Sequence, residues 1–170
     1  ALSGLPLFGE HNVANALMAW EAVAALGPLG SDGVAALRGF RGLAHRMERL
    51  GSKGNVQVVN NSMCTNPVAV IVSSQSVPGR QHLIVGGNTK GLDFRPLGAY
   101  LRETDHKAYL IGPEPGLMNA MLEGEWEAFD DLESAFLAAA GLAAPGETVM
   151  LAPGCASTEP FQNFRERGDA

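Results

Sequence analysis

From residue 46 onward, short apolar stretches that suit β-strands alternate with stretches that suit α-helices. Strands are expected at 46–50, 56–60, 82–85, 107–111, 125–129 and 147–151, and helices at 66–76, 95–102, 116–122 and 130–140. The first two strands, joined across 51–55, suggest a β-hairpin. Strands and helices that alternate through short loops form a mainly parallel sheet with helices on both faces. The sequence therefore predicts an α/β fold for this part of the chain.

The first 43 residues follow a different, all-helical pattern. Val13, Ala16 and Trp20 recur at helical spacing within 11–26, and Gly27-Pro28 should end that helix. A second helix is expected from about Ser31, as its N-cap, to residue 40. We therefore expect two units, residues 1–43 and residues 44–170.

Composition narrows the classes of function. Charged residues make up 18% of the chain, the formal net charge is −6, and no Lys/Arg-rich stripe with interleaved aromatics occurs, so nucleic acid is not an expected partner. No apolar run approaches the roughly 18 residues of a membrane span, and the first residues do not resemble a signal peptide. Cys64 and Cys155 lack metal-ligand spacing and are expected to be semi-buried thiols in a reducing cytoplasm, with a disulfide or metal site as the alternative. The two ends of the sequence lead us to expect a piece of a longer protein.

Three polar loops should follow strands, at 60–66, 86–93 and 152–164, and the second and third contain glycine. Ligands of parallel sheets bind at the carboxyl ends of the strands, so a site is expected among these loops. The first loop opens a helix and suits an anion, although a capped turn explains it equally well. The second does not fit the Walker phosphate-loop pattern, but it presents Lys90, either as a point charge for a carboxylate or phosphate or as a solvated turn residue. Arg46 suits a phosphate or carboxylate, with a surface ion pair as the alternative.

The order of five motifs is more specific than any one of them. They are residues 9–16 (GEHNVANA), 40–48 (FRGLAHRME), 60–66 (NNSMCTN), 86–94 (GGNTKGLDF) and 152–168 (APGCASTEPFQNFRERG). In this order and at these spacings they resemble motifs of the Mur ligases, and most closely those of the branch that adds D-glutamate. The resemblance covers nearly the whole chain.

The resemblance implies an ATP-dependent, amide-bond-forming enzyme of peptidoglycan synthesis that acts in the cytoplasm. Residues 1–43 would be the tail of the central ATP-binding domain, and residues 44–170 the Rossmann-like, amino-acid-binding C-terminal domain. The amino acid, D-glutamate in the nearest branch, would be joined to a UDP-muramoyl precursor through an acyl phosphate.

The resemblance also assigns site residues. Asn12, Arg46 and Asn61 would lie on the nucleotide side, Thr65, Lys90 and Ser157 would hold the carboxylates of the amino acid, and Phe164 would line the same pocket. The phosphate loop and the ligands of Mg²⁺ lie upstream in this family, so this chain would contain no catalytic or metal-ligating residue. Alone, it would bind neither ATP nor Mg²⁺ at their main sites and would not turn over.

Two residues of the 60–66 loop depart from the family pattern. The family has Asp where this chain has Asn61, and Lys where it has Met63. This leaves three readings open: a D-glutamate ligase, a Mur-like ligase for another substrate, including the amidating type, and a stand-alone amino-acid-binding or docking module.

Overall fold

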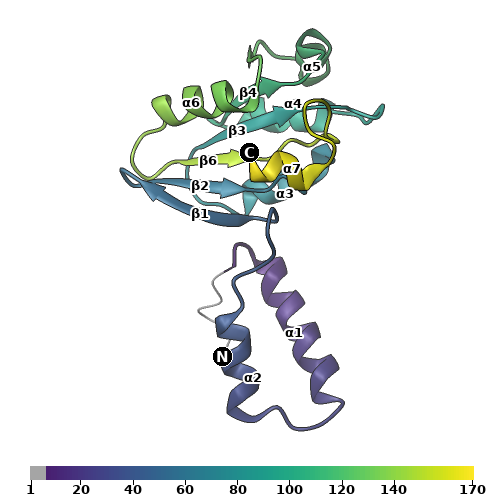
Figure 1. Ribbon diagram of the computed structural model, residues 1–170, viewed down its shortest axis with the longest axis vertical. Helices are drawn as coiled ribbons and strands as arrows, with labels where there is room; N and C mark the ends of the chain where they lie inside the picture. Colours follow the sequence, from purple (N-terminus) through teal and green to yellow (C-terminus); the bar gives the residue numbers. More distant parts are fainter. Residues whose placement is uncertain (1–6) are drawn as a thin grey trace. The chain divides into compact units, whose positions relative to one another are not determined.

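The computed structural model describes residues 7–170, which divide at Leu43/Ala44 into two compact units. Figure 1 shows a pair of helices in the first unit and a sheet with its covering helices in the second. None of the helices in the described range is long and apolar enough to cross a membrane. The two units are described separately below.

The first unit contains α1 (Glu10–Ala24) and α2 (Gly30–Gly39). The ring of Trp20 lies close to Gly33, where a Cβ atom would be 3.0 Å from the ring, so this glycine lets the helices approach. The prediction of Ser31 as an N-cap is wrong, because α2 begins at Gly30 and Leu29 is its N-cap. The first-turn N–H of Gly33 is bonded to the carbonyl of Leu29, and the Ser31 hydroxyl contacts Asp32 instead of the backbone.

The second unit is a six-stranded sheet with the order β1-β2-β6-β3-β4-β5. Its strands are β1 (Glu48–Lys53), β2 (Val56–Asn60), β3 (Gln81–Gly86), β4 (Lys107–Ile111), β5 (Glu127–Ala128) and β6 (Thr148–Leu151). The β1–β2 hairpin is antiparallel and every other pairing is parallel. The predicted α/β fold with a mainly parallel sheet is confirmed.

The helices of this unit are α3 (Pro67–Gln75), α4 (Arg95–Glu103), α5 (Pro115–Leu122), α6 (Leu132–Leu142) and α7 (Phe164–Asp169). Helix α6 packs on β3, β4 and β6, where Ala135 and Ala139 meet Ile84, Tyr109 and Val149. Successive strand residues point to opposite faces, so Leu83, Val85, Leu110 and Met150, all fully buried, form the core of the other face. Figure 1 shows α3 and α4 behind the sheet and α6 in front of it, so helices cover both faces.

Local sequence signals set several element ends. Asn66 caps α3 by accepting a hydrogen bond from the Ala69 N–H, and Asp131 caps α6 through the Ser134 N–H. The predicted hairpin turn shrinks to Gly54-Asn55, both with positive φ, because β1 continues to Lys53. A register shift between Arg49 and Gly51 allows this continuation.

The last strand, β6, lies between β2 and β3 and pairs with both in parallel. This position brings the carboxyl ends of β2, β6 and β3 to the same edge of the sheet. The three polar loops that follow these strands therefore lie next to one another.

Candidate amino-acid site at the carboxyl edge of the sheet

Backbone hydrogen bonds join the three loops. Asn88 of the β3–α4 loop and Ala156 of the loop after β6 exchange two N–H···O bonds of 2.9 and 3.0 Å. The N–H of Gly154 donates to the carbonyl of Cys64 at 3.0 Å, which links the loop after β6 to the β2–α3 loop. The loop after β6 is thus held on both sides, and the loops act as one surface.

Gly87 permits the closest of these approaches. Its φ is 127°, and a Cβ atom there would lie 2.4 Å from the carbonyl oxygen of Ala156 and 3.1 Å from the Cβ of Cys155. Any larger residue would push the two loops apart, so Gly87 has a packing role beyond flexibility.

Lys90 lies in the β3–α4 loop with a left-handed backbone (φ 51°) and an exposed side chain. Its N–H donates to the side-chain oxygen of Asn88 at 2.9 Å, and the Gly91 N–H donates to the Thr89 hydroxyl. These bonds fix the backbone of the loop and leave the ammonium group without an ion pair to the residues described. A fixed backbone that carries a free cation suits an anionic ligand.

The β2–α3 loop contributes Thr65, which is exposed immediately before the N-cap of α3. Met63 is 37% exposed, whereas Asn61 is 4% exposed. Both polar atoms of the Asn61 side chain are engaged inside the protein: Oδ1 accepts from the Met47 N–H at 3.1 Å, and Nδ2 donates to the Ser73 hydroxyl at 2.8 Å. The two departures from the family pattern therefore occupy different environments, Met63 at the surface and Asn61 in the interior.

Ser157 and Phe164 come from the loop after β6 and its following helix. The Ser157 hydroxyl is buried and has no hydrogen-bond partner within residues 7–170, which is costly unless a ligand or water supplies one. Phe164 is half-buried at the start of α7, with its ring edge-on to His45 at 6.2 Å and the Arg165 guanidinium 5.5 Å from its centre. An unpaired hydroxyl in a loop is suited to a polar ligand, and a partly buried aromatic ring is suited to the apolar part of one.

Arg167 on α7 is buried beneath these loops at 2% exposure. Its Nε donates to the Ser62 hydroxyl at 3.1 Å, and its Nη2 donates to the carbonyls of Ser62 (2.9 Å) and Cys155 (3.2 Å). No carboxylate of the described chain pairs with it, its Nη1 has no partner, and burial lowers its pKa to about 10. The guanidinium therefore remains charged at neutral pH and holds the first and third loops together.

Arg46 lies in the turn that precedes β1, with its side chain exposed, and the ring of His45 in the same turn is buried. Asn12 belongs to the first unit, where its side-chain amide donates to the Phe8 carbonyl at 2.8 Å. The structure places Thr65, Lys90 and Ser157 on adjoining loops of the second unit and Phe164 at the start of α7, while Asn12 lies in the first unit.

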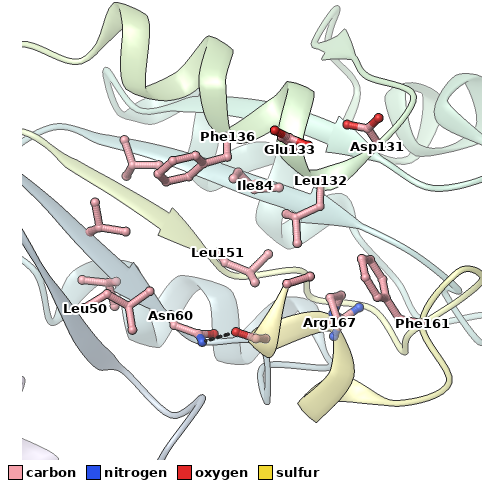
Figure 2. Close-up of a pocket in the computed structure, with 15 residues that line it drawn as sticks. Leu50, Asn60, Ile84, Asp131, Leu132, Glu133, Phe136, Leu151, Phe161 and Arg167 are labelled. Atoms are coloured by element: carbon pink, nitrogen blue, oxygen red, sulfur yellow. Dashed lines mark hydrogen bonds between the residues drawn. The ribbon is translucent and has the colours of Figure 1, made fainter.

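Two pockets lie near this edge. A pocket of about 430 Å³ at the ends of β3 and β4 includes Gly86, Gly87, Gly112, Thr158 and Arg167. A larger one of about 590 Å³ is mainly apolar, and Figure 2 shows Phe161 and Arg167 at one end of it and Leu50 and Phe136 at the other. Neither pocket is lined by the four residues that the sequence assigned to the amino acid.

Cys64 and Cys155 are free thiols within the joined loops. Burial raises the pKa of Cys64 to about 11 and that of Cys155 to about 12. Both are therefore protonated at neutral pH, as expected of structural thiols and unlike nucleophiles. Within the described residues, no group of three or more His, Cys, Asp or Glu side chains is arranged to hold a metal ion.

Sequence reasoning did not single out the roles of Asn60 and Arg167. Asn60 is 3% exposed, and its amide donates to the Gly168 carbonyl at 2.8 Å, the dashed line in Figure 2. The same amide nitrogen lies 3.1 Å from the His45 ring nitrogen Nδ1. Arg167 follows Phe164 by three residues, so the two share one side of a helical turn, and that spacing was a usable signal.

Comparison with known proteins agrees with this architecture. The family described as "Mur ligase, glutamate ligase domain" matches residues 45–155. The UDP-N-acetylmuramoylalanine–D-glutamate ligase of Brucella abortus (strain 2308) is 42% identical over 96% of this chain and 36% of its own length. The enzyme of the same name from Pelotomaculum thermopropionicum is 38% identical over 98% of this chain and 37% of its own length. The chain thus spans little more than a third of the length of these curated relatives.

Solved structures share the fold at low identity. Folylpolyglutamate synthase of Mycobacterium tuberculosis, solved with ADP and AMPPCP, superposes with a TM-score of 0.67 and 18% identity over 89% of this chain and 39% of its own. MurF ligase of Thermotoga maritima, solved with ADP, gives a TM-score of 0.50 and 22% identity over 69% of this chain and 29% of its own. The family match covers most of the second unit, and the five motifs and the sheet topology agree with it. We conclude that this chain belongs to the Mur ligase family.

Proposed function

We propose that this chain is the amino-acid-binding part of a cytoplasmic, ATP-dependent ligase that joins D-glutamate to UDP-N-acetylmuramoyl-alanine in peptidoglycan synthesis. The observation that carries the proposal is the joined loop surface. It contains the Lys90 ammonium and the Ser157 hydroxyl, neither of which has a partner among residues 7–170. The names of relatives that are 37–42% identical over nearly the whole chain support D-glutamate as the amino acid.

The substrate chemistry fits these residues. D-Glutamate carries two carboxylates, and each requires a donor or a cation in place of the water that it loses. Lys90 supplies a charge, Thr65 and Ser157 supply hydroxyls, and Phe164 supplies an apolar ring. Buried Arg167 adds a positive charge beneath the same loops.

The nucleotide belongs mainly to another part of the ligase. ATP supplies the phosphoryl group that converts a substrate carboxylate into an acyl phosphate, and Mg²⁺ neutralises its phosphates. We place both main sites outside this chain, in line with its family resemblance. Within it, Asn12 and Arg46 contact the nucleotide, and Asn61 supports that side of the site. The division into residues 1–43 and 44–170 then separates the end of an ATP-binding domain from the amino-acid-binding domain.

The test uses the complete polypeptide that carries this chain. Phosphate release from ATP is measured with UDP-N-acetylmuramoyl-L-alanine and a panel of amino acids. D-Glutamate should give the highest kcat/KM, and the new product should carry one added glutamate by mass. Phosphate release that does not depend on any added amino acid would contradict the proposal.

One observation favours a second candidate, a Mur-like ligase for a less acidic substrate. Met63 is 37% exposed on the β2–α3 loop, at a position where the family motif carries a lysine, so one cation is missing from the surface of the site. If the same panel gives a neutral amino acid or ammonia the highest kcat/KM, this second candidate replaces the first.

A further inference from the structure

Arg46 sits between two residues with unusual backbone conformations. His45 and Met47 have φ angles of 61° and 49°, in the left-handed region that residues with a Cβ atom rarely adopt. Such conformations cost free energy and persist only where surrounding contacts enforce them. The chain here maintains two of them on either side of one exposed arginine.

The contacts that enforce this turn come mainly from the β2–α3 loop. The Met47 N–H donates to Asn61 Oδ1 at 3.1 Å, the Met63 N–H donates to the His45 carbonyl at 3.0 Å, and Asn60 Nδ2 lies 3.1 Å from His45 Nδ1. The Glu48 carboxylate adds a local bond from the His45 N–H at 2.8 Å.

Asn61 is the member of this set with the firmest anchor. Its N–H donates to the Leu151 carbonyl at 2.8 Å, which fixes it to β6, and its Nδ2 donates to the Ser73 hydroxyl on α3. Only its Oδ1 reaches out of this frame, to the backbone of Met47. Through its Oδ1, Asn61 links the turn to both β6 and α3, and Asn60 of β2 contacts His45 separately.

Arg46 itself is free. Its side chain is exposed, and its guanidinium makes no hydrogen bond or ion pair with residues 7–170. An arginine whose backbone is fixed and whose side chain is unoccupied is ready to bind an anion without first losing another partner.

We propose that Asn61 is a positioning residue that acts through Arg46, holding the strained turn that presents this guanidinium to the nucleotide. The identity of the ligand as a nucleotide rests on the proposed function. The link from Asn61 to the turn that carries Arg46 does not depend on it. At 4% exposure, with both polar atoms occupied, Asn61 acts on the nucleotide indirectly. A carboxylate at this position would also accept the Met47 N–H, and its second oxygen would accept from the Ser73 hydroxyl, so Asp is expected to hold the turn as Asn does.

The first experiment uses the 170-residue chain and needs no substrate. We expect trypsin to cleave after Arg46 only when the turn opens, and cleavage then follows the open population when reclosing is fast. Cleavage after Lys53, on the exposed β1–β2 hairpin, serves as the internal reference. Loss of one hydrogen bond in Asn61→Ala should raise the ratio of cleavage at Arg46 to cleavage at Lys53 by roughly three- to tenfold.

Two variants separate this effect from general destabilisation. Asn61→Asp keeps the acceptor and should restore the wild-type ratio. Asn66→Ala removes the N-cap of α3 in the same loop without touching the turn, and should leave the ratio unchanged. A wild-type ratio in Asn61→Ala, or an equal rise in Asn66→Ala, would overturn the proposal.

The second experiment is a double-mutant cycle on the KM for ATP in the complete polypeptide. Asn61→Ala should raise this KM in the presence of Arg46 and have no further effect in an Arg46→Ala background. Additive effects would show that Asn61 acts independently of Arg46 and would refute the proposal. A polypeptide without ATP-dependent activity would refute the proposed function, and the proteolysis ratio would still decide whether Asn61 holds the turn.

Discussion

At the scale of single residues, the charge of Lys90 is the most direct test of the amino-acid site. Lys90→Ala removes a charge-assisted contact worth about 1.5–3 kcal/mol. In the complete ligase, kcat/KM for the amino acid should fall by roughly 10- to 150-fold, while the KM for ATP stays near its wild-type value. Lys53→Ala, at an exposed lysine of the β1–β2 hairpin, is the matched control. Equal kcat/KM values for the wild type and Lys90→Ala would show that Lys90 is a solvated turn residue.

The two thiols allow a test of packing in the joined loops. Because burial raises the pKa of Cys64 to about 11 and that of Cys155 to about 12, neither is a thiolate at pH 8. Both should resist a disulfide reagent such as dithionitrobenzoate in the native chain. They should react at once in about 6 M guanidinium chloride, which unfolds the chain. Rapid modification of either thiol under native conditions would mean that the loops open easily.

Side-chain roles in the site could be predicted from the sequence only in part. Lys90 and Thr65 stand out because they lie in loops of recognisable composition, and the structure exposes both. The spacing of Arg167 from Phe164 indicates that the two share one side of a helical turn. It does not show that Arg167 is buried under two distant loops, because an arginine in a polar segment is ordinarily solvated. The sequence shows that Asn61 replaces the Asp of the family motif. It does not show the contacts of Asn61 to Met47 and Ser73, because these depend on packing between elements.

At the scale of elements, α3 is the helix on which the first loop depends. Its N-cap is the Asn66 side chain, which accepts a hydrogen bond from the Ala69 N–H at 2.8 Å, followed by Pro67 in the first turn. Asn66→Ala should lower the free energy of unfolding by about 1 kcal/mol, measured by urea denaturation of the 170-residue chain. Asn66→Asp keeps the acceptor and should lie close to the wild type. Equal losses in both variants would assign the effect to something other than the cap.

The first residue of a helix could be predicted from the sequence where a capping side chain fixes it. Asn66 and Asp131 each bond the N–H three residues ahead, as their positions in the sequence suggested. The prediction of Ser31 as an N-cap was wrong because α2 begins one residue earlier, at Gly30, where the Leu29 carbonyl accepts the first helical hydrogen bond. The expected strand at 125–129 shrank to Glu127–Ala128, since an edge strand is limited by its single neighbour, β4.

At the scale of the whole molecule, the chain should fold and yet be catalytically silent. The second unit has its own core on both faces of the sheet, whereas the phosphate loop of the family does not occur in this sequence. The purified 170-residue chain should therefore give a cooperative unfolding transition and release no phosphate from ATP above the background of a heat-denatured sample. Phosphate release that co-purifies with the folded chain would contradict this expectation.

The position of β6 also matters while the chain is being made. Residues 148–151 are the last strand in the sequence but pair with both β2 and β3 inside the sheet. As the chain leaves the ribosome, the β1–β2 hairpin and the β3–β4–β5 half therefore exist first as two fragments, each with an unpaired strand edge. These edges can meet their proper partner only when β6 emerges, so the interval before that moment is when the nascent protein is most exposed to mispairing and to capture by chaperones.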